Sequence, residues 1–318
     1  MKKIFITRKL LDKNFSYIKE KFKVVHNQDD KNFLDSDIIR LSSDCDGILT
    51  FPNNNFHTDL LKKLPSNIKI IANYAVGFGN IDIDTAKEKK IIVTNTPEVL
   101  TDATAEISIL LLLGASRRAY EGRIYAENKS WEWSADFLIG KQMTNKKLGI
   151  LGMGRIGRAV ANIARGFGME IHYHNRSKLS EKLENGAIFH ERLEDLLRHS
   201  EFLSINCPGG KTNTNLINKD TLKYLPDGAV IANAARGEII NDEDMIQAIK
   251  NGKVFALGLD VYNGEPLIHE EYLKLKKLFL LPHLGSATTK TRIAMGERAI
   301  NNLDQFLNKS NKPLDQVN

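Results

Sequence analysis

The stretch Leu148-Gly149-Ile150-Leu151-Gly152-Met153-Gly154-Arg155-Ile156-Gly157 lies near the middle of a chain of 318 residues. It is a G-x-G-x-x-G motif that follows an apolar, strand-like segment and opens a helix-like one. In that setting the first glycine allows a tight turn, the second lets a pyrophosphate approach the backbone, and the third lets the helix pack closely on the strand. The free N–H groups at the start of the helix would face the phosphates. The motif therefore indicates a dinucleotide site; the alternative is a glycine-rich turn without a ligand.

Short apolar runs alternate with amphipathic stretches on both sides of this motif. The strand candidates before it are Lys3–Thr7, Phe22–His26, Gly47–Thr50, Lys69–Asn73 and Ile91–Thr94, separated by helix-like segments such as Asn14–Lys21 and Thr58–Lys63. Those from the motif onward are Lys147–Leu151, Glu170–His174, Phe202–Asn206, Val230–Asn233, Ala256–Leu259 and Leu278–Leu281. This βαβ rhythm predicts an α/β fold of two doubly wound parallel-sheet domains, and the glycine motif indicates that the second is a Rossmann cofactor domain.

Two long helices are expected at the domain junctions. Thr101-Asp102-Ala103-Thr104-Ala105-Glu106 offers a helix start with a capping side chain and acids in the first turn, and the helix could run to about Ala126. A second helix, roughly Thr288 to Leu307, is expected to return to the first domain. We therefore predict a discontinuous substrate domain at 1–98 and 289–318 and a dinucleotide-binding domain at 99–288.

Composition limits the classes of partner. The net charge is +6, but the lysines are scattered among acids, which favours an ordinary solvated surface over a nucleic-acid-binding one. The N-terminus goes straight into a strand pattern, and no segment has the length of a membrane span. Cys45 and Cys207 suggest neither a disulfide framework nor a metal site. We expect a cytoplasmic protein that binds no nucleic acid, membrane or metal.

Three chemically suitable residues follow three strand candidates in the second series. Reduction of a 2-oxo acid by a nicotinamide needs a cation for the carboxylate, an acid that titrates near neutrality, and a group that tunes that acid. Arg236, Glu265 and His283 supply these types. Ligands of open α/β sheets bind at the carboxyl ends of strands, so the three can converge. Singly, each could instead be an ordinary surface cation, a helix cap or an unremarkable histidine; together, downstream of a dinucleotide turn, they favour a catalytic group.

Along nearly its whole length the chain resembles the D-isomer-specific 2-hydroxyacid dehydrogenase family. The Thr94–Pro97 and Gly285–Thr288 runs look most like those of glyoxylate/hydroxypyruvate reductases. The resemblance is carried by the glycine motif together with Asn73–Asp82, Thr94–Pro97, Ala234–Gly237, Gly258–Val261, Gly264–Pro266 and Pro282–Thr288.

The resemblance implies that the first domain is a flavodoxin-like substrate domain, separated by a cleft from the Rossmann cofactor domain, and it implies a role for each candidate residue. His283 would be the general acid toward the carbonyl oxygen, and Glu265 would hydrogen-bond its imidazole and favour the protonated form. Arg236 would grip the substrate carboxylate and carbonyl, while backbone N–H groups of Val76 and Gly77 would bind the other side of the carboxylate. The residues expected at the cofactor are Thr104, Gly152, Gly154, Arg155, Ile156, Gly157, Asn175, Arg176, Ser177, Cys207, Pro208, Ala234, Ala235, Arg236, Asp260, His283 and Gly285, with Asp260 beside the nicotinamide carboxamide.

The second strand of the cofactor series indicates which nicotinamide is used. NAD-selective folds usually end this strand with an acid that binds the ribose hydroxyls, whereas here it ends in His174-Asn175-Arg176-Ser177. A 2′-phosphate would find a guanidinium, a hydroxyl and an amide there, so we predict a preference for NADPH. The alternative is that Arg176 stacks on adenine and that both cofactors are used.

Two weaker features leave alternatives open. Phe51-Pro52-Asn53 follows a strand of the first domain and either contacts the substrate side chain or merely closes a turn. Trp131 and Trp133 lie in a segment that packs across a dimer in relatives, which suggests a homodimer, although packing on their own domain is nearly as reasonable.

The predicted function is NADPH-preferring reduction of a small anionic 2-oxo acid, glyoxylate or hydroxypyruvate, to the 2-hydroxy acid. One alternative is an NAD-linked D-lactate-type or broad-specificity 2-hydroxyacid dehydrogenase. An alternative outside enzymes is a nucleotide-sensing, corepressor-like binding protein, which the complete set of candidate catalytic residues disfavours.

Overall fold

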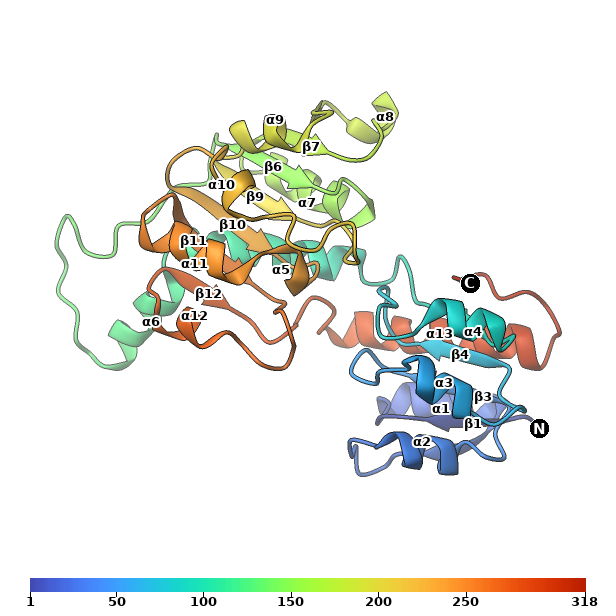
Figure 1. Cartoon of the computed structure of the whole chain (residues 1–318). Coiled ribbons are helices and arrows are strands. Elements are labelled where there is room, and N and C mark those ends of the chain that lie inside the picture. Colours follow the sequence, from blue (N-terminus) through green and yellow to red (C-terminus); the bar gives the residue numbers. More distant parts are fainter. The chain divides into compact units, whose positions relative to one another are not determined.

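A computed structural model describes all 318 residues of the chain. The chain divides into two compact units, Met1–Leu100 together with Ala287–Asn318, and Thr101–Ser286. Each unit is built around its own parallel sheet (Figure 1). The predicted fold class, two parallel-sheet α/β domains, is thereby confirmed.

The first unit has five parallel strands in the order β2-β1-β3-β4-β5, a doubly wound arrangement of the flavodoxin type. All five predicted strands are present, with ends within one residue of those expected. The strands are β1 (Lys3–Ile6), β2 (Lys23–His26), β3 (Gly47–Thr50), β4 (Ile70–Asn73) and β5 (Ile92–Thr94), and the helices are α1 (Asp12–Lys21), α2 (Asp35–Leu41), α3 (Thr58–Lys63), α4 (Ile83–Glu88) and α13 (Thr289–Leu307).

The C-terminal helix α13 packs on α1 and on strands β3 and β4 of this unit. Asn14 of α1 donates a hydrogen bond from its Nδ2 to the carbonyl of Ile293, 2.9 Å away. Arg298 binds both carboxylate oxygens of Asp315 at 2.8 Å. The Asn14 bond and the packing of α13 on β3 and β4 place a helix from the far end of the chain in the core of the first unit.

The second unit has seven parallel strands in the order β12-β11-β10-β9-β6-β7-β8. From β6 outward this is the order of a Rossmann sheet, with one strand added at the end. The six predicted strands are present; β8 was missed because two residues are too few to show a periodicity. The strands are β6 (Lys147–Leu151), β7 (Glu170–His174), β8 (Ile188–Phe189), β9 (Phe202–Ile205), β10 (Ala229–Asn233), β11 (Val254–Leu259) and β12 (Leu278–Leu280).

The helix expected to run from Thr101 to about Ala126 is in fact two helices, α5 (Thr101–Ser116) and α6 (Ala119–Glu127). Arg118 between them is left-handed, with φ of 55°. The carbonyl of Ser116 accepts the N–H of Lys141 at 2.8 Å instead of continuing the helix. That partner lies 25 residues further on, so the local sequence, which has no Pro there, carried no sign of the break. The other helices of the unit are α7 (Arg155–Arg165), α8 (Glu181–Glu184), α9 (Leu193–Arg198), α10 (Lys219–Leu222), α11 (Asp242–Lys250) and α12 (Glu270–Lys274), with a 3₁₀ turn at Gly237–Ile239.

The alternation of side chains along the strands separates two cores in this unit. Leu148 and Ile150 of β6 pack with α5 and α7, whereas Leu151 packs with α9, α10 and α11 on the other face. Because both faces are covered, the strands are apolar at nearly every position. The carboxyl ends of the strands are left at one edge of the sheet, where the candidate residues lie.

Candidate active site

The glycine turn after β6 has the geometry that a pyrophosphate needs. Gly152 has φ of 96°, and a Cβ there would lie 2.5 Å from the backbone nitrogen of Cys207. A Cβ on Gly157 would lie 2.3 Å from the carbonyl oxygen of Gly152, so only glycine lets α7 start this close to the strand. Gly154, in contrast, has no atom within 4 Å of its Cβ position. The turn is therefore tight at its first and third glycines and open at its second.

The end of β7 forms the rim beside this turn. The side-chain oxygen of Asn175 accepts the N–H of Met153 at 2.7 Å, which ties the rim to the glycine turn and leaves the Asn175 amide N–H groups free. Arg176 and Ser177 are exposed, and neither has a hydrogen bond or an ion pair within the chain. A cation and a hydroxyl are thus unpaired where an acid would stand in an NAD-selective strand end.

His283 and Glu265 form a hydrogen-bonded pair. His283 Nδ1 lies 2.7 Å from Glu265 Oε2, and the other carboxylate oxygen accepts the N–H of Tyr262 at 2.9 Å. Burial raises the pKa of Glu265, but the hydrogen bond and charge of His283, the Tyr262 N–H and the charge of Arg236 together bring it below its ordinary value. Glu265 is therefore ionised at neutral pH. With Nδ1 engaged, Nε2 is the nitrogen of His283 left for another group.

The loop that carries His283 is held by Asp260 at the end of β11. His283 is left-handed, with φ of 55°, and its N–H donates to the carbonyl of Asp260 at 2.9 Å. The Asp260 carboxylate accepts the N–H groups of Leu284 at 2.6 Å and Gly285 at 2.8 Å. Burial raises the pKa of Asp260 despite these two bonds and the charge of His283. Asp260 thus positions the backbone around His283.

The N-terminal turn of α5 supports the same loop. Thr104 is buried and donates its hydroxyl to the carbonyl of Gly285 at 3.0 Å. Of the other residues expected near the cofactor, Cys207 is buried, which raises the pKa of its thiol to about 11, and Pro208 is exposed. Cys207 is consequently a packing residue for Gly152 and no ionised ligand.

Arg236 follows β10 and has no acidic partner. Its guanidinium donates from Nη1 to the carbonyl of Ala235 at 2.6 Å, and it forms no salt bridge in the chain. A Cβ on the following Gly237 would lie 2.0 Å from the carbonyl carbon of Tyr262, so glycine lets this turn pack on the segment that bears Glu265. The structure thus brings Arg236, Glu265 and His283 together, with one cation unpaired.

A loop in the first unit has free backbone donors. The carbonyls of Val76 and Gly77 accept the side-chain amides of Asn95 and Asn73, at 2.8 and 2.9 Å. The N–H groups of Val76 and Gly77 donate no hydrogen bond within the chain. The loop is thus fixed through its carbonyls and retains two donors that suit an anion.

Comparison with known proteins gives the family. Residues 109–285 match the model of the D-isomer specific 2-hydroxyacid dehydrogenase, NAD binding domain. The chain belongs to this family. A glycerate dehydrogenase from Hyphomicrobium methylovorum is 39% identical over 95% of each chain. A glyoxylate reductase from Thermococcus kodakarensis is 38% identical over 96% of this chain and 93% of its own.

A solved structure agrees over the whole length. It is an NADPH-dependent glyoxylate/hydroxypyruvate reductase from Sinorhizobium meliloti in complex with NADP and malonate, with a TM-score of 0.89 and 27% identity over 99% of this chain and 96% of that one. The 2-hydroxyacid dehydrogenase family acts on the CH–OH group of its donors with a nicotinamide, and the matched NAD-binding domain contains Arg236, Glu265 and His283. No helix of this member of the family has both the length and the apolarity needed to cross a membrane.

The structure of this dehydrogenase describes two features that the sequence left open. Phe51 closes a turn, because its carbonyl accepts the N–H of Asn54 at 3.0 Å, and its ring stacks on Tyr74 with centroids 4.7 Å apart. Trp131 and Trp133 are 55% and 84% exposed, so neither side chain is buried in the core of its own domain.

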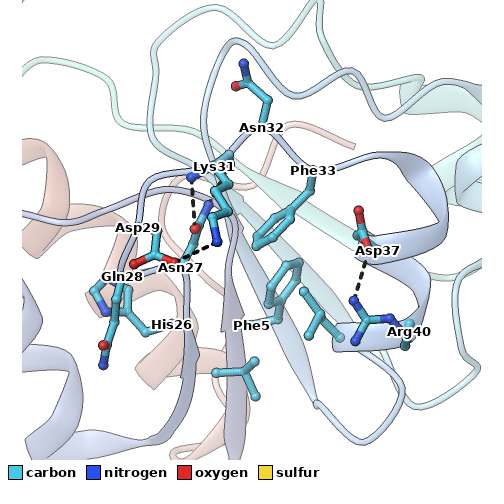
Figure 2. Close-up of a pocket in the computed structure, with 12 residues that line it drawn as sticks. Phe5, His26, Asn27, Gln28, Asp29, Lys31, Asn32, Phe33, Asp37 and Arg40 are labelled. Atoms are coloured by element: carbon cyan, nitrogen blue, oxygen red, sulfur yellow. Dashed lines mark hydrogen bonds and ion pairs between the residues drawn. The ribbon is translucent and has the colours of Figure 1, made fainter.

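Each unit also has a hollow on its surface. One, of about 530 Å³, lies in the first unit beside β2 and α2 and is lined by Phe5, Phe33, Asn27 and their neighbours (Figure 2). Its polar groups bind one another: Asn27 bonds the backbone of Lys31, and Asp37 pairs with Arg40. The other, of about 720 Å³, is lined by residues of α10 and α11. Neither contains a predicted site residue.

Sequence reasoning missed one cluster of side chains in the second unit that could bind a metal ion. His172, His190 and His199 lie together, with one ring nitrogen of each within 4.8 Å of those of the others. Their spacing along the chain matches no metal motif. The only sequence signal was the alternation that places His172 and His174 on the same face of β7.

Proposed function

We propose that the protein reduces a small 2-oxo acid, glyoxylate or hydroxypyruvate, to the 2-hydroxy acid with NADPH. The observation that carries this proposal is the His283–Glu265 pair next to Arg236, a cation without an acidic partner, in a family whose NAD-binding domain this chain contains. The names of the relatives support the substrate class, because they include a glycerate dehydrogenase and a glyoxylate reductase.

The second unit is proposed to hold the cofactor. The open space at Gly154 and the direction of the N–H groups at the start of α7 suit the pyrophosphate, and Arg176, Ser177 and the Asn175 amide suit a 2′-phosphate. Arg155, Ile156, Ala234 and Ala235 would line the same edge of the sheet. The reduced nicotinamide supplies a hydride when bound.

His283 is proposed as the general acid. Its Nε2 would donate a proton to the carbonyl oxygen as that oxygen gains negative charge. Glu265 fixes the ring through Nδ1 and offsets the positive charge of the imidazolium. Asp260 keeps the loop of His283 in its left-handed conformation, so the ring need not be reorganised during the reaction.

Arg236 is proposed to bind the substrate carboxylate and to polarise its carbonyl. Its planar guanidinium can form two parallel hydrogen bonds with a carboxylate, which lysine cannot. In the first unit, the two free N–H groups at Val76 and Gly77 are proposed as donors to an anionic group of the substrate. A 2-oxo acid is thus fixed through the group that all such acids share, while its side chain is left variable.

The function is tested by measuring kcat/KM for glyoxylate, hydroxypyruvate and pyruvate, each with NADPH and with NADH. We expect the highest values for the first two acids with NADPH. His283→Ala should lower kcat about 10²- to 10⁴-fold, the usual contribution of a general acid, while NADPH still binds in a fluorescence titration.

The matched control is His269→Ala, because His269 forms a similar surface pair with Glu243 at 3.0 Å. That variant should keep wild-type turnover. A clear NADH preference would refute the cofactor assignment and favour an NAD-linked dehydrogenase. Near-normal turnover in His283→Ala would refute the catalytic assignment.

A further inference from the structure

Three histidines gather on one face of the Rossmann sheet because of the strand register. His172 lies on β7, and His190 follows β8, whose residues pair with β7 so that His190 N–H binds the carbonyl of Tyr173 at 2.8 Å. His199 directly follows α9, which packs against β6 and β7. Ile171 and Tyr173 face the opposite core, so the alternation of β7 directs His172 toward α9.

The spacing of the three rings is close to that of imidazoles around one metal ion. Their centroids are 5.1, 5.0 and 4.8 Å apart in the three pairs. Three imidazoles bound to a tetrahedral zinc ion, with Zn–N bonds of about 2.0–2.1 Å, have centroids roughly 5.2 Å apart. Ring rotation would bring the coordinating nitrogens, now within 4.8 Å, to the separation of about 3.3 Å that such bonds require.

The outward nitrogens of two rings are held as they are in metal sites. His172 Nε2 lies 2.6 Å from Glu170 Oε1, and His199 Nδ1 lies 2.8 Å from the carbonyl oxygen of Asp195. Since a carboxylate and a carbonyl only accept, the protons are on these nitrogens, and the other nitrogen of each ring has its lone pair. Metal-bound histidines almost always donate their second N–H to a carboxylate or a carbonyl in this way.

The remaining nitrogen of His172, Nδ1, faces the partner ring. It lies 2.8 Å from Nε2 of His190, so without a metal these two atoms share one hydrogen bond. The cluster offers three nitrogen donors, with no cysteine and one carboxylate in an outer position.

We propose that His172, His190 and His199 bind one divalent ion of the zinc class, with water completing the coordination. Imidazole ligands suit Zn²⁺ and its neighbours, whereas Mg²⁺ and Ca²⁺ prefer oxygen. His199 precedes the amino end of β9, while the glycine turn and His283 lie at carboxyl ends of strands. The site is therefore separate from the proposed reaction, and the ion would link β7, the end of β8 and the end of α9.

The proposal is tested by titrating chelator-treated full-length protein with Zn²⁺ alone and with Co²⁺ alone. Equilibrium dialysis with elemental analysis should give one ion per chain. The melting temperature should rise with Zn²⁺ concentration, because an ion that binds only the folded state stabilises it. Co²⁺ should give the visible absorption of a low-coordinate nitrogen site. Absence of bound metal after titration with either ion would overturn the proposal.

Variants assign the ion to the cluster. His190→Gln and His199→Gln, both at half-buried positions, should each weaken Zn²⁺ binding at least about 100-fold, and Glu170→Gln about 10- to 100-fold, as for an outer-shell partner. The control is His57→Gln, since His57 is exposed and pairs with Asp35 in the other unit. Circular dichroism establishes that each variant is folded. If the cluster variants bound Zn²⁺ as tightly as His57→Gln, the ion would have to bind elsewhere and the proposal would be overturned.

Discussion

At the scale of single residues, the chemistry of the site depends on which charged groups are paired. Glu265 binds His283 and the Tyr262 N–H, Asp260 binds two N–H groups, and Arg236 and Arg176 have no acidic partner. Unpaired guanidinium groups in a folded protein are available to anionic ligands. The proposed substrate and the proposed 2′-phosphate are both anions of this kind.

Arg176→Ala tests the cofactor preference. A charge-assisted hydrogen bond contributes roughly 1.5–3 kcal/mol, so kcat/KM with NADPH should fall about tenfold or more, while kcat/KM with NADH stays nearly constant. The control is Arg198→Ala at the end of α9, before the amino end of β9, which should change neither value. Equal losses with both cofactors would instead favour stacking of Arg176 on adenine.

Glu265→Gln should make the free energy of unfolding depend less on pH in the acid range. The pKa of Glu265 in the folded chain lies below its ordinary value of 4.5, so the carboxylate stabilises the fold above about pH 4.5 and loses this effect as pH falls through the lowered value. The difference in free energy of unfolding between wild type and variant should be largest near neutral pH and should narrow below pH 4. Urea titrations at pH 7 and pH 3.5 measure it.

The control for this comparison is Glu243→Gln, whose exposed carboxylate pairs with His269. It should show almost no difference from wild type at either pH. A Glu265→Gln difference of equal size at both pH values would contradict the argument.

At the scale of elements, two glycines of the turn between β6 and α7 have different roles: one is needed for packing and the other leaves space for a ligand. A Cβ on Gly157 collides with the carbonyl of Gly152, whereas one on Gly154 meets no atom of the chain. Gly157→Ala should therefore cost roughly 1–3 kcal/mol of stability, the usual cost of overpacking. Gly154→Ala should cost at most about 1 kcal/mol, for the poorer helix cap, yet weaken NADPH binding strongly. Thermal unfolding and cofactor titration of both variants distinguish the two roles.

Elements also show where prediction from the sequence succeeds. The strands were found because apolar runs bounded by turns are local signals, and the glycine turn because its spacing is local. The division of the expected long helix at Arg118 depends on the distant Lys141 N–H, and β8 depends on pairing with β7. Neither feature has a local signal strong enough to predict it.

At the scale of the whole molecule, several large apolar side chains are exposed on α6 and on the chain that follows it. Helix α6 has no buried residue, and the chain after it projects from the second unit as a long loop (Figure 1). The exposed apolar side chains there are Tyr120, Ile124, Tyr125, Trp131, Trp133 and Ile139. Tryptophan and tyrosine side chains are enriched at interfaces, so we propose a second copy of the chain as the partner.

Replacing both Trp131 and Trp133 with serine should convert a dimer into a monomer. Sedimentation velocity measures the masses, and circular dichroism should be unchanged because the two side chains contribute little to the core. Leu273→Ser, at a 65% exposed position on α12, is the control and should remain dimeric. A monomeric wild-type protein, or a dimeric double variant, would contradict the proposed interface.

The sequence by itself determined the fold class and the place of the glycine turn, because these depend on local periodicity and on glycine spacing, and it supplied the residues that we propose for catalysis. It could not determine which side chains become partners. The bonds of Asp260 to Leu284 and Gly285, the unpaired state of Arg236 and the gathering of His172, His190 and His199 join residues far apart in the chain. Such contacts follow from strand order and register, which only the tertiary structure decides.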